Sequence, residues 1–389
     1  MMNQLFFFLV FVAATTVNCQ VPSSGVTSTA ATTDLRLPTG TAPGSVEIAD
    51  VNSDGKPDIV VANEQSNNVT ILLGDGKGKF APAKGSPFAA GHLPNDIAIG
   101  DFNRDTKLDL AVANHEEKYL TVLLGDGNGG FAPAPNSPLA VEVKPHVHGV
   151  ATGDLNGDGN PDLVTDSWAN DQMLVLFGDG KANFRTPGTF VQVGKRPYQR
   201  HRVADVNGDG KADILTTNLE GNNVTVLLSD GSGGFKQPAG SPFDSGDSPF
   251  NFAVGDVNGD GKIDLAVVDS PSSTAEGHGK DGLTVMLGNG NGGFTMLAGS
   301  PLATGKTPNR VAIGDVNGDG VNDIAVSSPD DNNITLFLMS SRGTVASSSM
   351  IAVGGKPKGL AIRDLNGDGK ADVVTTNNGD NTVTIMLSK

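Results

Sequence analysis

Oxygen-bearing side chains alternate in the segment DLNGDGNPD, residues 154–162. Aspartate, asparagine and aspartate occupy its first, third and fifth positions, a glycine stands at the sixth, and another aspartate closes it at the ninth. Carboxylates this close repel one another unless a cation lies between them. Hard oxygen ligands around a tight, glycine-containing bend are typical of a calcium site.

The same nine-residue pattern recurs along the chain, so it marks an internal repeat. Its seven copies begin 51, 53, 51, 51, 59 and 49 residues apart, a regularity that unrelated turns would not show. In the second copy Thr106 replaces the glycine, although the four ligand side chains are retained. The predicted ligands of up to seven calcium ions are Asp50, Asn52, Asp54, Asp58, Asp101, Asn103, Asp105, Asp109, Asp154, Asn156, Asp158, Asp162, Asp205, Asn207, Asp209, Asp213, Asp256, Asn258, Asp260, Asp264, Asp315, Asn317, Asp319, Asp323, Asp364, Asn366, Asp368 and Asp372.

Two other interpretations of the nine-residue pattern are an EF-hand loop and a hairpin turn without an ion. An EF-hand loop begins in the same way, but it needs a glutamate at its twelfth position and flanking helices. Here the closing acid is the ninth residue, and both flanks are rich in Val, Ile and Leu, as strands are. Asp, Asn and Gly also form hairpin turns without any ion. Seven copies that keep every aspartate favour calcium.

The charge of the chain agrees with cation binding. Asp and Glu number 43 against 27 Lys and Arg, which gives a formal net charge of -16. About half of these acids lie in the repeated loops, so seven calcium ions would bring the net charge close to zero. The same negative charge would repel the phosphates of a nucleic acid, and we expect no nucleic-acid partner.

Each repeat contains four short apolar segments separated by Gly, Asn and Asp turns. In the second repeat the first three are DIAIGDF, LDLAVAN and LTVLLGDG, and the fourth begins at the GNGGF turn. Four strands in each of seven repeats predict an all-β protein, a seven-bladed β-propeller of four-stranded antiparallel blades. Residues 34–40 form an extra strand before the first blade, and pairing them with residues 383–387 would complete the last blade and close the ring.

Tandem D-x-N-x-D-G-x-x-D loops between strands, together with GDGxGxF turns, resemble the FG-GAP/VCBS repeats. That family builds the seven-bladed propeller at the head of integrin α subunits and of many bacterial surface proteins, and a secreted fungal lectin is also similar. The resemblance spans residues 34–389 and implies the propeller fold and calcium, but it does not identify a ligand. The sixth repeat departs from the pattern, because LMSSRGTVASS replaces its GDGxGxF turn.

The chain begins with MMNQLFFFLVFVAATTVNCQ, whose uncharged apolar core is too short to span a bilayer. We therefore predict a signal peptide over residues 1–19, a Ser/Thr-rich linker over 20–33 and the propeller over 34–389. Cleavage after Cys19 would remove the only cysteine, and a lipid anchor on Cys19 is the alternative. Either outcome makes the protein secreted or cell-surface, with no membrane-spanning segment.

The connections on the side of the blades opposite the acidic loops differ most between repeats. We predict a partner-binding surface there, because tryptophan, tyrosine and arginine dominate binding hot spots. The alternative is that the same side chains pack in the central channel and against neighbouring blades. The candidate ligand-binding residues are His115, Tyr119, His146, His148, Trp168, Tyr198, Arg200 and His201.

Three functions follow from these features. The first is an extracellular adhesion or recognition module for a protein ligand, and the second is a carbohydrate-binding lectin, for which one tryptophan offers few stacking sites. The third, an extracellular hydrolase, has no G-x-S-x-G elbow, no H-E-x-x-H motif and no cysteine nucleophile after signal cleavage, so we expect no enzyme. His146, His148 and His201 could still bind a transition metal or supply a base near Asp166.

Overall fold

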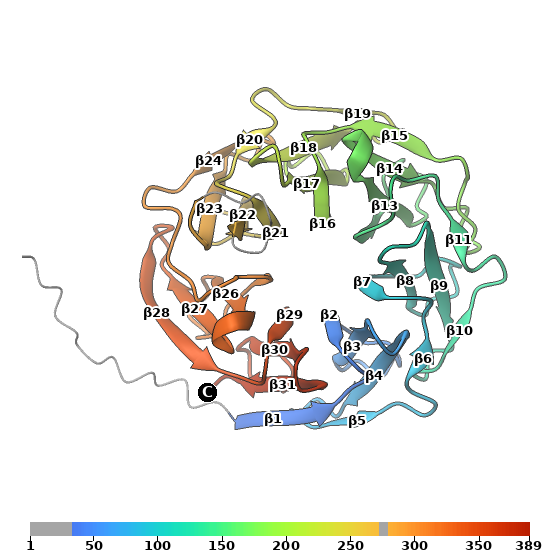
Figure 1. The fold of residues 1–389 in the computed structure, drawn as a ribbon, viewed down its shortest axis with the longest axis horizontal. Coiled ribbons are helices and arrows are strands. Elements are labelled where there is room, and N and C mark those ends of the chain that lie inside the picture. Colours follow the sequence, from blue (N-terminus) through green and yellow to red (C-terminus); the bar gives the residue numbers. More distant parts are fainter. Residues whose placement is uncertain (1–32, 272–278) are drawn as a thin grey trace, which may run out of the picture.

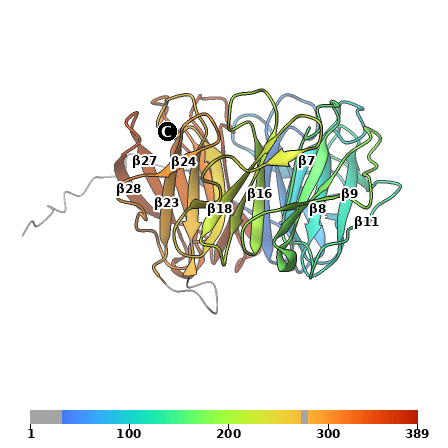
Figure 2. The same ribbon diagram turned by 90° about the horizontal axis from the view of Figure 1, so that it is seen from above.

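The computed structural model describes residues 33–271 and 279–389. The predicted signal peptide and all but the last residue of the predicted linker lie outside these described residues. Within them, the chain forms a ring of seven antiparallel sheets around a central axis (Figure 1). From the side, the strands run between the two faces of a short cylinder, where the connections gather (Figure 2). The predicted all-β, seven-bladed propeller is therefore confirmed.

The first three blades follow one another along the chain. Blade one contains β2 (Pro43–Ala49), β3 (Asp58–Asn63), β4 (Asn68–Gly74), β5 (Phe80–Pro82) and β6 (Phe88–Ala89). Blade two contains β7 (Pro94–Gly100), β8 (Asp109–Asn114), β9 (Tyr119–Gly125), β10 (Phe131–Pro133) and β11 (Leu139–Ala140). Blade three contains β12 (Val150–Gly153), β13 (Asp162–Ser167), the 3-10 turn η1 (Trp168–Asn170), β14 (Gln172–Leu176) and β15 (Thr189–Gln192).

The next three blades continue in the same order. Blade four contains β16 (Pro197–Ala204), β17 (Asp213–Asn218), β18 (Asn223–Ser229), β19 (Phe235–Lys236) and β20 (Phe243–Asp244). Blade five contains β21 (Pro249–Gly255), β22 (Asp264–Asp269), β23 (Gly282–Gly288) and β24 (Phe294–Met296). Blade six contains β25 (Val311–Gly314), β26 (Asp323–Ser328), η3 (Pro329–Asp331), β27 (Asn333–Met339) and β28 (Val345–Ala352).

Blade seven is built from both ends of the described chain. Its inner strands are β29 (Pro357–Arg363), β30 (Asp372–Asn377) and β31 (Thr382–Leu387), and its outer strand is β1 (Thr33–Pro38). Leu35 pairs with Ile385 and Leu37 with Val383 in the antiparallel register. The predicted closing strand is therefore confirmed, and β1 and β31 lie side by side in Figure 1.

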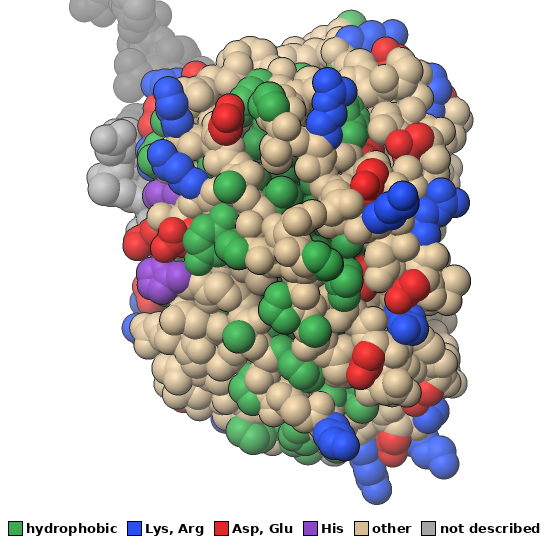
Figure 3. Space-filling model, turned by 90° about the vertical axis from the view of Figure 1, so that its right-hand side faces the viewer, with side chains coloured by type: hydrophobic (Ala, Val, Ile, Leu, Met, Phe, Trp, Pro, Cys, Tyr) green, Lys and Arg blue, Asp and Glu red, His purple; other side chains and the backbone are tan. Residues whose placement is uncertain are grey.

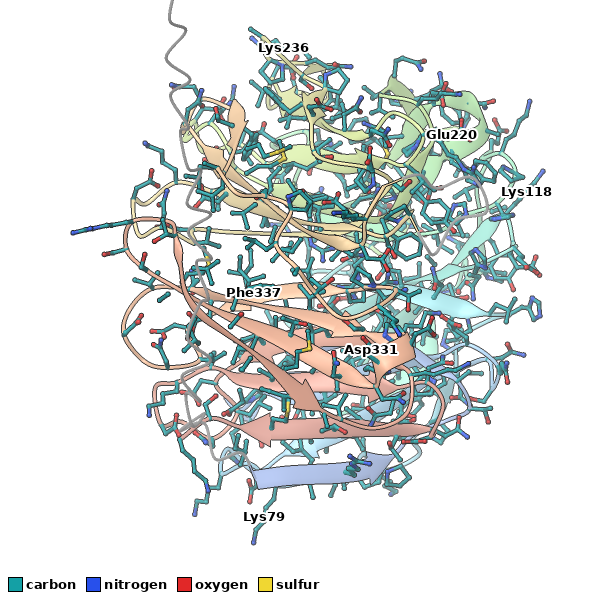
Figure 4. All side chains as sticks on the ribbon, turned by 60° about the vertical axis from the view of Figure 1, so that its left-hand side comes forward. Lys79, Lys118, Glu220, Lys236, Asp331 and Phe337 are labelled. Atoms are coloured by element: carbon teal, nitrogen blue, oxygen red, sulfur yellow. The ribbon has the colours of Figure 1, made fainter. Side chains whose placement is uncertain are left out.

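The hydrophobic core is divided into clusters that each join two adjacent blades. One cluster unites blades one and two, for example, and another unites blades five and six. Each sheet therefore buries both faces, which explains why strands such as β3 and β8 are buried along their whole length and apolar between their terminal aspartate and asparagine. Phe337 of β27 lies in this interior, 3% exposed, whereas Lys79 and Lys236 project from the periphery (Figure 4).

The outermost strand of several blades is interrupted. In blade one it is split into β5 and β6, and between them the hydroxyl of Ser86 accepts a hydrogen bond from the backbone N–H of Ile71 at 2.9 Å. Ser86, which precedes Pro87, thus supplies the acceptor that a backbone carbonyl would supply in an uninterrupted outer strand. Blade six, whose turn departs from the pattern, instead has one continuous outer strand, β28, paired along all of β27.

Among the described residues, no helix is both long enough and apolar enough to cross a membrane.

Candidate functional site

Each acidic loop connects the first and second strands of its blade. In blade three, for example, residues 154–161 join β12 to β13. Because every blade has the same strand order, all seven loops lie at the same end of their sheets, on one face of the cylinder (Figure 2). The connections between second and third strands, which include η1, lie on the opposite face. The predicted placement of the acidic loops on one face and of the second-to-third-strand connections on the other thus follows from the observed topology.

The backbone of each loop curls around its carboxylates. In blade three, Asp154 accepts hydrogen bonds from the N–H groups of Gly157 at 2.7 Å and Gly159 at 2.9 Å. Oδ1 of Asn156 accepts the N–H of Asp158 at 2.9 Å. The side chains of the first, third and fifth positions are therefore drawn to one side of a single tight bend.

The glycine at the sixth position has a left-handed backbone, as Gly159 shows with a φ of 79°. Thr106 adopts the same conformation in the second loop, with a φ of 71°, and its N–H still donates to Asp101 at 2.8 Å. A β-branched residue is strained there, because its Cβ crowds the backbone when φ is positive. The second loop therefore keeps the common shape at an energetic cost.

The ninth aspartate differs from the other three ligands because it is fully buried. In blade three, Asp162 accepts the N–H of Leu155 through Oδ2 and the N–H of Gly178 through Oδ1, both at 2.8 Å. Burial raises the pKa of Asp162 to about 6 despite these two donors, and the charges of Asp158 and Asp154 contribute to the rise. The loop thus concentrates negative charge that only a cation would offset.

The donor chemistry of the loops fits calcium. Every candidate side-chain ligand offers an oxygen, and a carboxylate oxygen that accepts one hydrogen bond retains a second lone pair. Asp154, Asn156, Asp158 and Asp162 would hold the ion in blade three, and a bound ion would neutralise their mutual repulsion.

A lysine accompanies some of the loops. Lys56 Nζ lies 3.1 Å from Asp54, and Lys262 Nζ lies 3.2 Å from Asp260. In blade three the same position holds Asn160, whose Oδ1 accepts a hydrogen bond from the guanidinium of Arg104 at 3.2 Å. A cationic side chain therefore lies next to this loop as well.

On the opposite face, three of the predicted ligand-binding histidines come together. The ring centroids of His115, His146 and His148 lie 5.0, 5.1 and 4.7 Å apart in pairs. Trp168 lies beside them, 5.5 Å from His148, and Tyr198 lies 4.5 Å from His148 on another side. We call these five side chains the histidine cluster. In the rim view of Figure 3, the visible histidines lie at one edge.

Asp166, at the buried end of the histidine cluster, orients two imidazoles. It accepts Nδ1 of His148 at 2.7 Å and Nε2 of His201 at 3.2 Å. Burial alone would raise the pKa of Asp166, but the charges and hydrogen bonds of His148 and His201 hold it well below its usual range. Burial lowers the pKa of His115 to about 4, with smaller contributions from His148 and His146, and it also lowers the pKa of His146.

Three predicted ligand-binding residues lie away from the histidine cluster. Arg200 is 4% exposed and forms ion pairs with Glu47 at 2.8 Å and Asp96 at 3.0 Å, across the central axis. His201 is fully buried, with Nδ1 3.0 Å from the hydroxyl of Thr216. The third is Tyr119, whose hydroxyl accepts the N–H of His92 at 3.0 Å. Arg200 and His201 thus make internal contacts. This agrees with the alternative that such side chains pack in the central channel and against neighbouring blades.

Sequence reasoning missed one contact of this face. The guanidinium of Arg196 lies 4.4 Å above the ring of Trp168 and donates to Glu220 at 2.8 Å. A cation over an indole ring is favourable. Arg196 lies in the turn before β16, and no spacing in the sequence links it to Trp168 in the preceding blade.

Comparison with known proteins agrees with the repeat architecture. The FG-GAP-like repeat model matches residues 50–112, 101–165, 205–267, 273–326 and 315–375, well over half of the chain. This chain belongs to the FG-GAP-like repeat family. Its characteristic loops are those that carry the candidate calcium ligands.

Two curated relatives of this FG-GAP protein are distant. Cartilage acidic protein 1 of Xenopus tropicalis is 28% identical over 179 residues, 43% of this chain and 28% of that protein. The T-cell immunomodulatory protein of Homo sapiens is 28% identical over 138 residues, 34% of this chain and 22% of that protein. The alignments thus span about a quarter of the length of these relatives.

Solved structures share the fold at low sequence identity. An Agrocybe aegerita lectin that recognises non-reducing terminal N-acetylglucosamine has a TM-score of 0.53 and 21% identity, covering 82% of this chain and 80% of that chain. Virginiamycin B lyase from Staphylococcus aureus has a TM-score of 0.58 and 13% identity, covering 92% and 100%. Such likeness concerns the propeller alone.

Proposed function

We propose that this FG-GAP protein is a secreted, calcium-binding propeller that recognises an extracellular protein through the face opposite its acidic loops. Calcium would fix the seven loops, and the histidine cluster with its surroundings would meet the partner. Secretion rests on the signal peptide predicted over residues 1–19. We propose binding rather than catalysis, because Asp166 and His201 are fully buried and the sequence has none of the hydrolase motifs considered above.

The observation that carries this proposal is a contrast between the two faces. On the loop face, the four candidate ligand positions hold the same residues in every blade: aspartate, asparagine, aspartate and, at the ninth position, aspartate. On the opposite face, the first residue after the second strand differs in every blade. These residues are Glu64, His115, Trp168, Leu219, Ser270, Pro329 and Asn378. Repeated residues suit repeated ions, whereas one asymmetric surface suits one specific partner.

A lectin is the second candidate. Trp168 is partly exposed, and a sugar ring would stack on its indole at the face that the guanidinium of Arg196 does not cover. Because no other blade has an aromatic side chain at the equivalent position apart from His115, such stacking would not repeat around the ring. This favours a protein partner over a glycan bound at many sites.

Binding is tested with the secreted full chain in millimolar calcium and again in a calcium chelator. The fluorescently labelled protein is applied to an array of glycans and to immobilised extracellular matrix proteins. Trp168→Ala removes the central side chain of the proposed surface. Met350→Ala is the matched control, because Met350 is an apolar side chain 59% exposed on the outer strand β28.

We expect calcium-dependent binding to a matrix protein that Trp168→Ala weakens at least about tenfold and Met350→Ala leaves unchanged. Binding to glycans with the same sensitivity would make the protein a lectin. Binding that survives Trp168→Ala would contradict recognition by this face.

A further inference from the structure

Two chain segments from different blades bring the three histidines together. His115 follows β8 directly, while His146 and His148 lie in the loop that leads into β12. A parallel β-bridge joins His115 to Val147, and the backbone N–H of Val147 donates a hydrogen bond to the backbone carbonyl of Glu117 at 3.0 Å. These main-chain contacts hold the two segments side by side. The three imidazoles therefore start from backbone positions that are fixed relative to one another.

The spacing of the ring nitrogens suits one shared ion. Nε2 of His146 lies 3.2 Å from Nε2 of His148. Two imidazole ligands of a tetrahedral zinc ion, each about 2.0–2.1 Å from the metal, have their nitrogens about 3.3 Å apart. One ligand atom from each of the three histidines falls within 4.8 Å of the other two. His115 is partly exposed, and its ring would move closer to the other two on binding, because 4.8 Å exceeds the nitrogen separation of two zinc ligands.

A buried carboxylate fixes the orientation of one ligand. Asp166 accepts a hydrogen bond from Nδ1–H of His148, so Nε2 of His148 carries a lone pair, which accepts a hydrogen bond from Nε2 of His146 at 3.2 Å and would bind the ion once His146 releases that proton. Asp166 is itself held by the N–H groups of His148 at 3.0 Å and Gly149 at 3.2 Å. A carboxylate behind a ligating histidine is the usual outer-sphere support of protein zinc sites.

We infer that His115, His146 and His148 form a binding site for one divalent transition-metal ion of the zinc type. Three imidazoles suit such borderline ions, whereas calcium, which takes oxygen ligands, belongs in the acidic loops on the other face. Three protein ligands leave a fourth coordination position for water or for a ligand atom. Nε1 of Trp168 is buried without a hydrogen-bond partner among the described residues, so the indole N–H next to the site is an unused hydrogen-bond donor.

The only tryptophan of the chain makes the site measurable. The full chain is first saturated with calcium, so that the acidic loops are filled, and is then titrated with Zn²⁺ by calorimetry and with Co²⁺ by absorption and fluorescence. We expect one equivalent of Zn²⁺, a visible absorption band from four-coordinate Co²⁺ that Zn²⁺ abolishes, and quenching of Trp168 by Co²⁺. Cobalt bound on the opposite face would leave Trp168 fluorescence nearly unchanged.

Two single variants separate metal binding from folding. His146→Ala and His115→Ala should each lower the affinity for Zn²⁺ by more than about 100-fold and remove the Co²⁺ band, since each deletes a ligand. His92→Ala is the control, because the side chain of His92 is exposed and its Nδ1 lies 3.1 Å from Glu117, outside the histidine cluster. Circular dichroism in calcium verifies that each variant is folded. If the wild-type chain bound no Zn²⁺, or if both ligand variants bound it as the wild type does, the inference would be wrong.

Discussion

The backbone N–H of Gly178 donates a 2.8 Å hydrogen bond to Oδ1 of Asp162, and this contact ties the acidic loop of blade three to the end of its third strand. The same bond recurs in the other six blades. Its pairs are Asp58 with Gly74, Asp109 with Gly125, Asp213 with Ser229, Asp264 with Gly288, Asp323 with Met339 and Asp372 with Ser388. The ninth aspartate therefore supports the fold as well as a bound ion.

Substitutions at the fifth and ninth positions of this loop should differ in their effects. Asp158→Asn replaces an exposed carboxylate ligand with a neutral amide, so we expect weaker calcium binding at this loop and a lower melting temperature in calcium only. Asp162→Asn turns an amide N–H toward one of the two backbone donors, and leaving a buried donor unpaired costs about 1–3 kcal/mol. That loss should be present in calcium and in chelator alike. Thermal unfolding of both variants, with and without calcium, makes the comparison.

Glu142→Gln removes an equal charge from an exposed position outside the loops and serves as the control. Chelation should lower the melting temperature of the wild-type chain, because seven ions that bind only the folded state each contribute to its stability. A melting temperature that does not respond to calcium would contradict calcium as the ion of these loops.

Thr106→Gly should stabilise the protein. Glycine accepts the left-handed backbone at this position freely, and we expect a gain of about 0.5–1 kcal/mol in the free energy of unfolding after the entropy of the unfolded glycine is deducted. The reverse change, Gly159→Thr in blade three, should destabilise, although a Cβ there would meet no other atom within 4 Å. Equal stability of Gly159→Thr and the wild type would show that the backbone conformation is not the cause. Urea denaturation in calcium measures both.

The fold could be predicted because its determinants are local and repeated. Each acidic loop specifies a turn and each apolar run specifies a strand within about ten residues. The seven copies of this pattern then give the number of blades. Even the pairing of the N-terminal strand with β31, in which Leu35 lies opposite Ile385, followed from a mismatch within the repeats, since one strand was left over before the first blade and one was missing from the last. The continuous β28 was not foreseen, because no glycine-rich turn marks its start.

The internal contacts of the central channel could not be read in the same way. Arg200 pairs with Glu47 and Asp96 from two other blades, and only the radius of the ring and the reach of the side chain bring them together. Likewise His201 lies within β16 and is buried against Asp166, whereas His146 lies in the loop before β12 and is partly exposed. Their partners come from other repeats, so spacing along the chain carries no signal.

Removal of the closing strand should open the ring. A variant that begins at residue 40 lacks β1, so the backbone edge of β31 and the apolar cluster beneath Leu35 and Leu37 become exposed. An unpaired strand edge promotes association with other chains. We expect a lower melting temperature and concentration-dependent self-association in analytical ultracentrifugation. Leu37→Ala, which keeps the strand, should cost about 1–2 kcal/mol without self-association. A monomeric truncated variant with unchanged stability would mean that closure is dispensable.

Asp269 should make the stability of the protein depend on pH. Burial raises the pKa of Asp269 to about 8; the hydrogen bond from Thr284 opposes this rise and the charge of Asp247 adds to it. Because the folded state then holds a proton that the unfolded state has released, this residue lowers stability as pH increases from about 4 to about 8. The equivalent residue in blade four is Asn218, whose Nδ2 donates to Thr225 at 2.8 Å.

Asp269→Asn should therefore restore the bond seen at Asn218 and raise the free energy of unfolding by about 2 kcal/mol at pH 8.5, with little gain near pH 4. Asn218→Asp is the matched reverse variant, and it should lose stability progressively over the same pH interval because it places an ionisable group in the same buried position. Urea unfolding at several pH values in saturating calcium measures how the free energy of unfolding of each variant changes with pH. A constant difference between Asp269→Asn and the wild type at every pH would show that the carboxyl of Asp269 titrates normally in the folded protein.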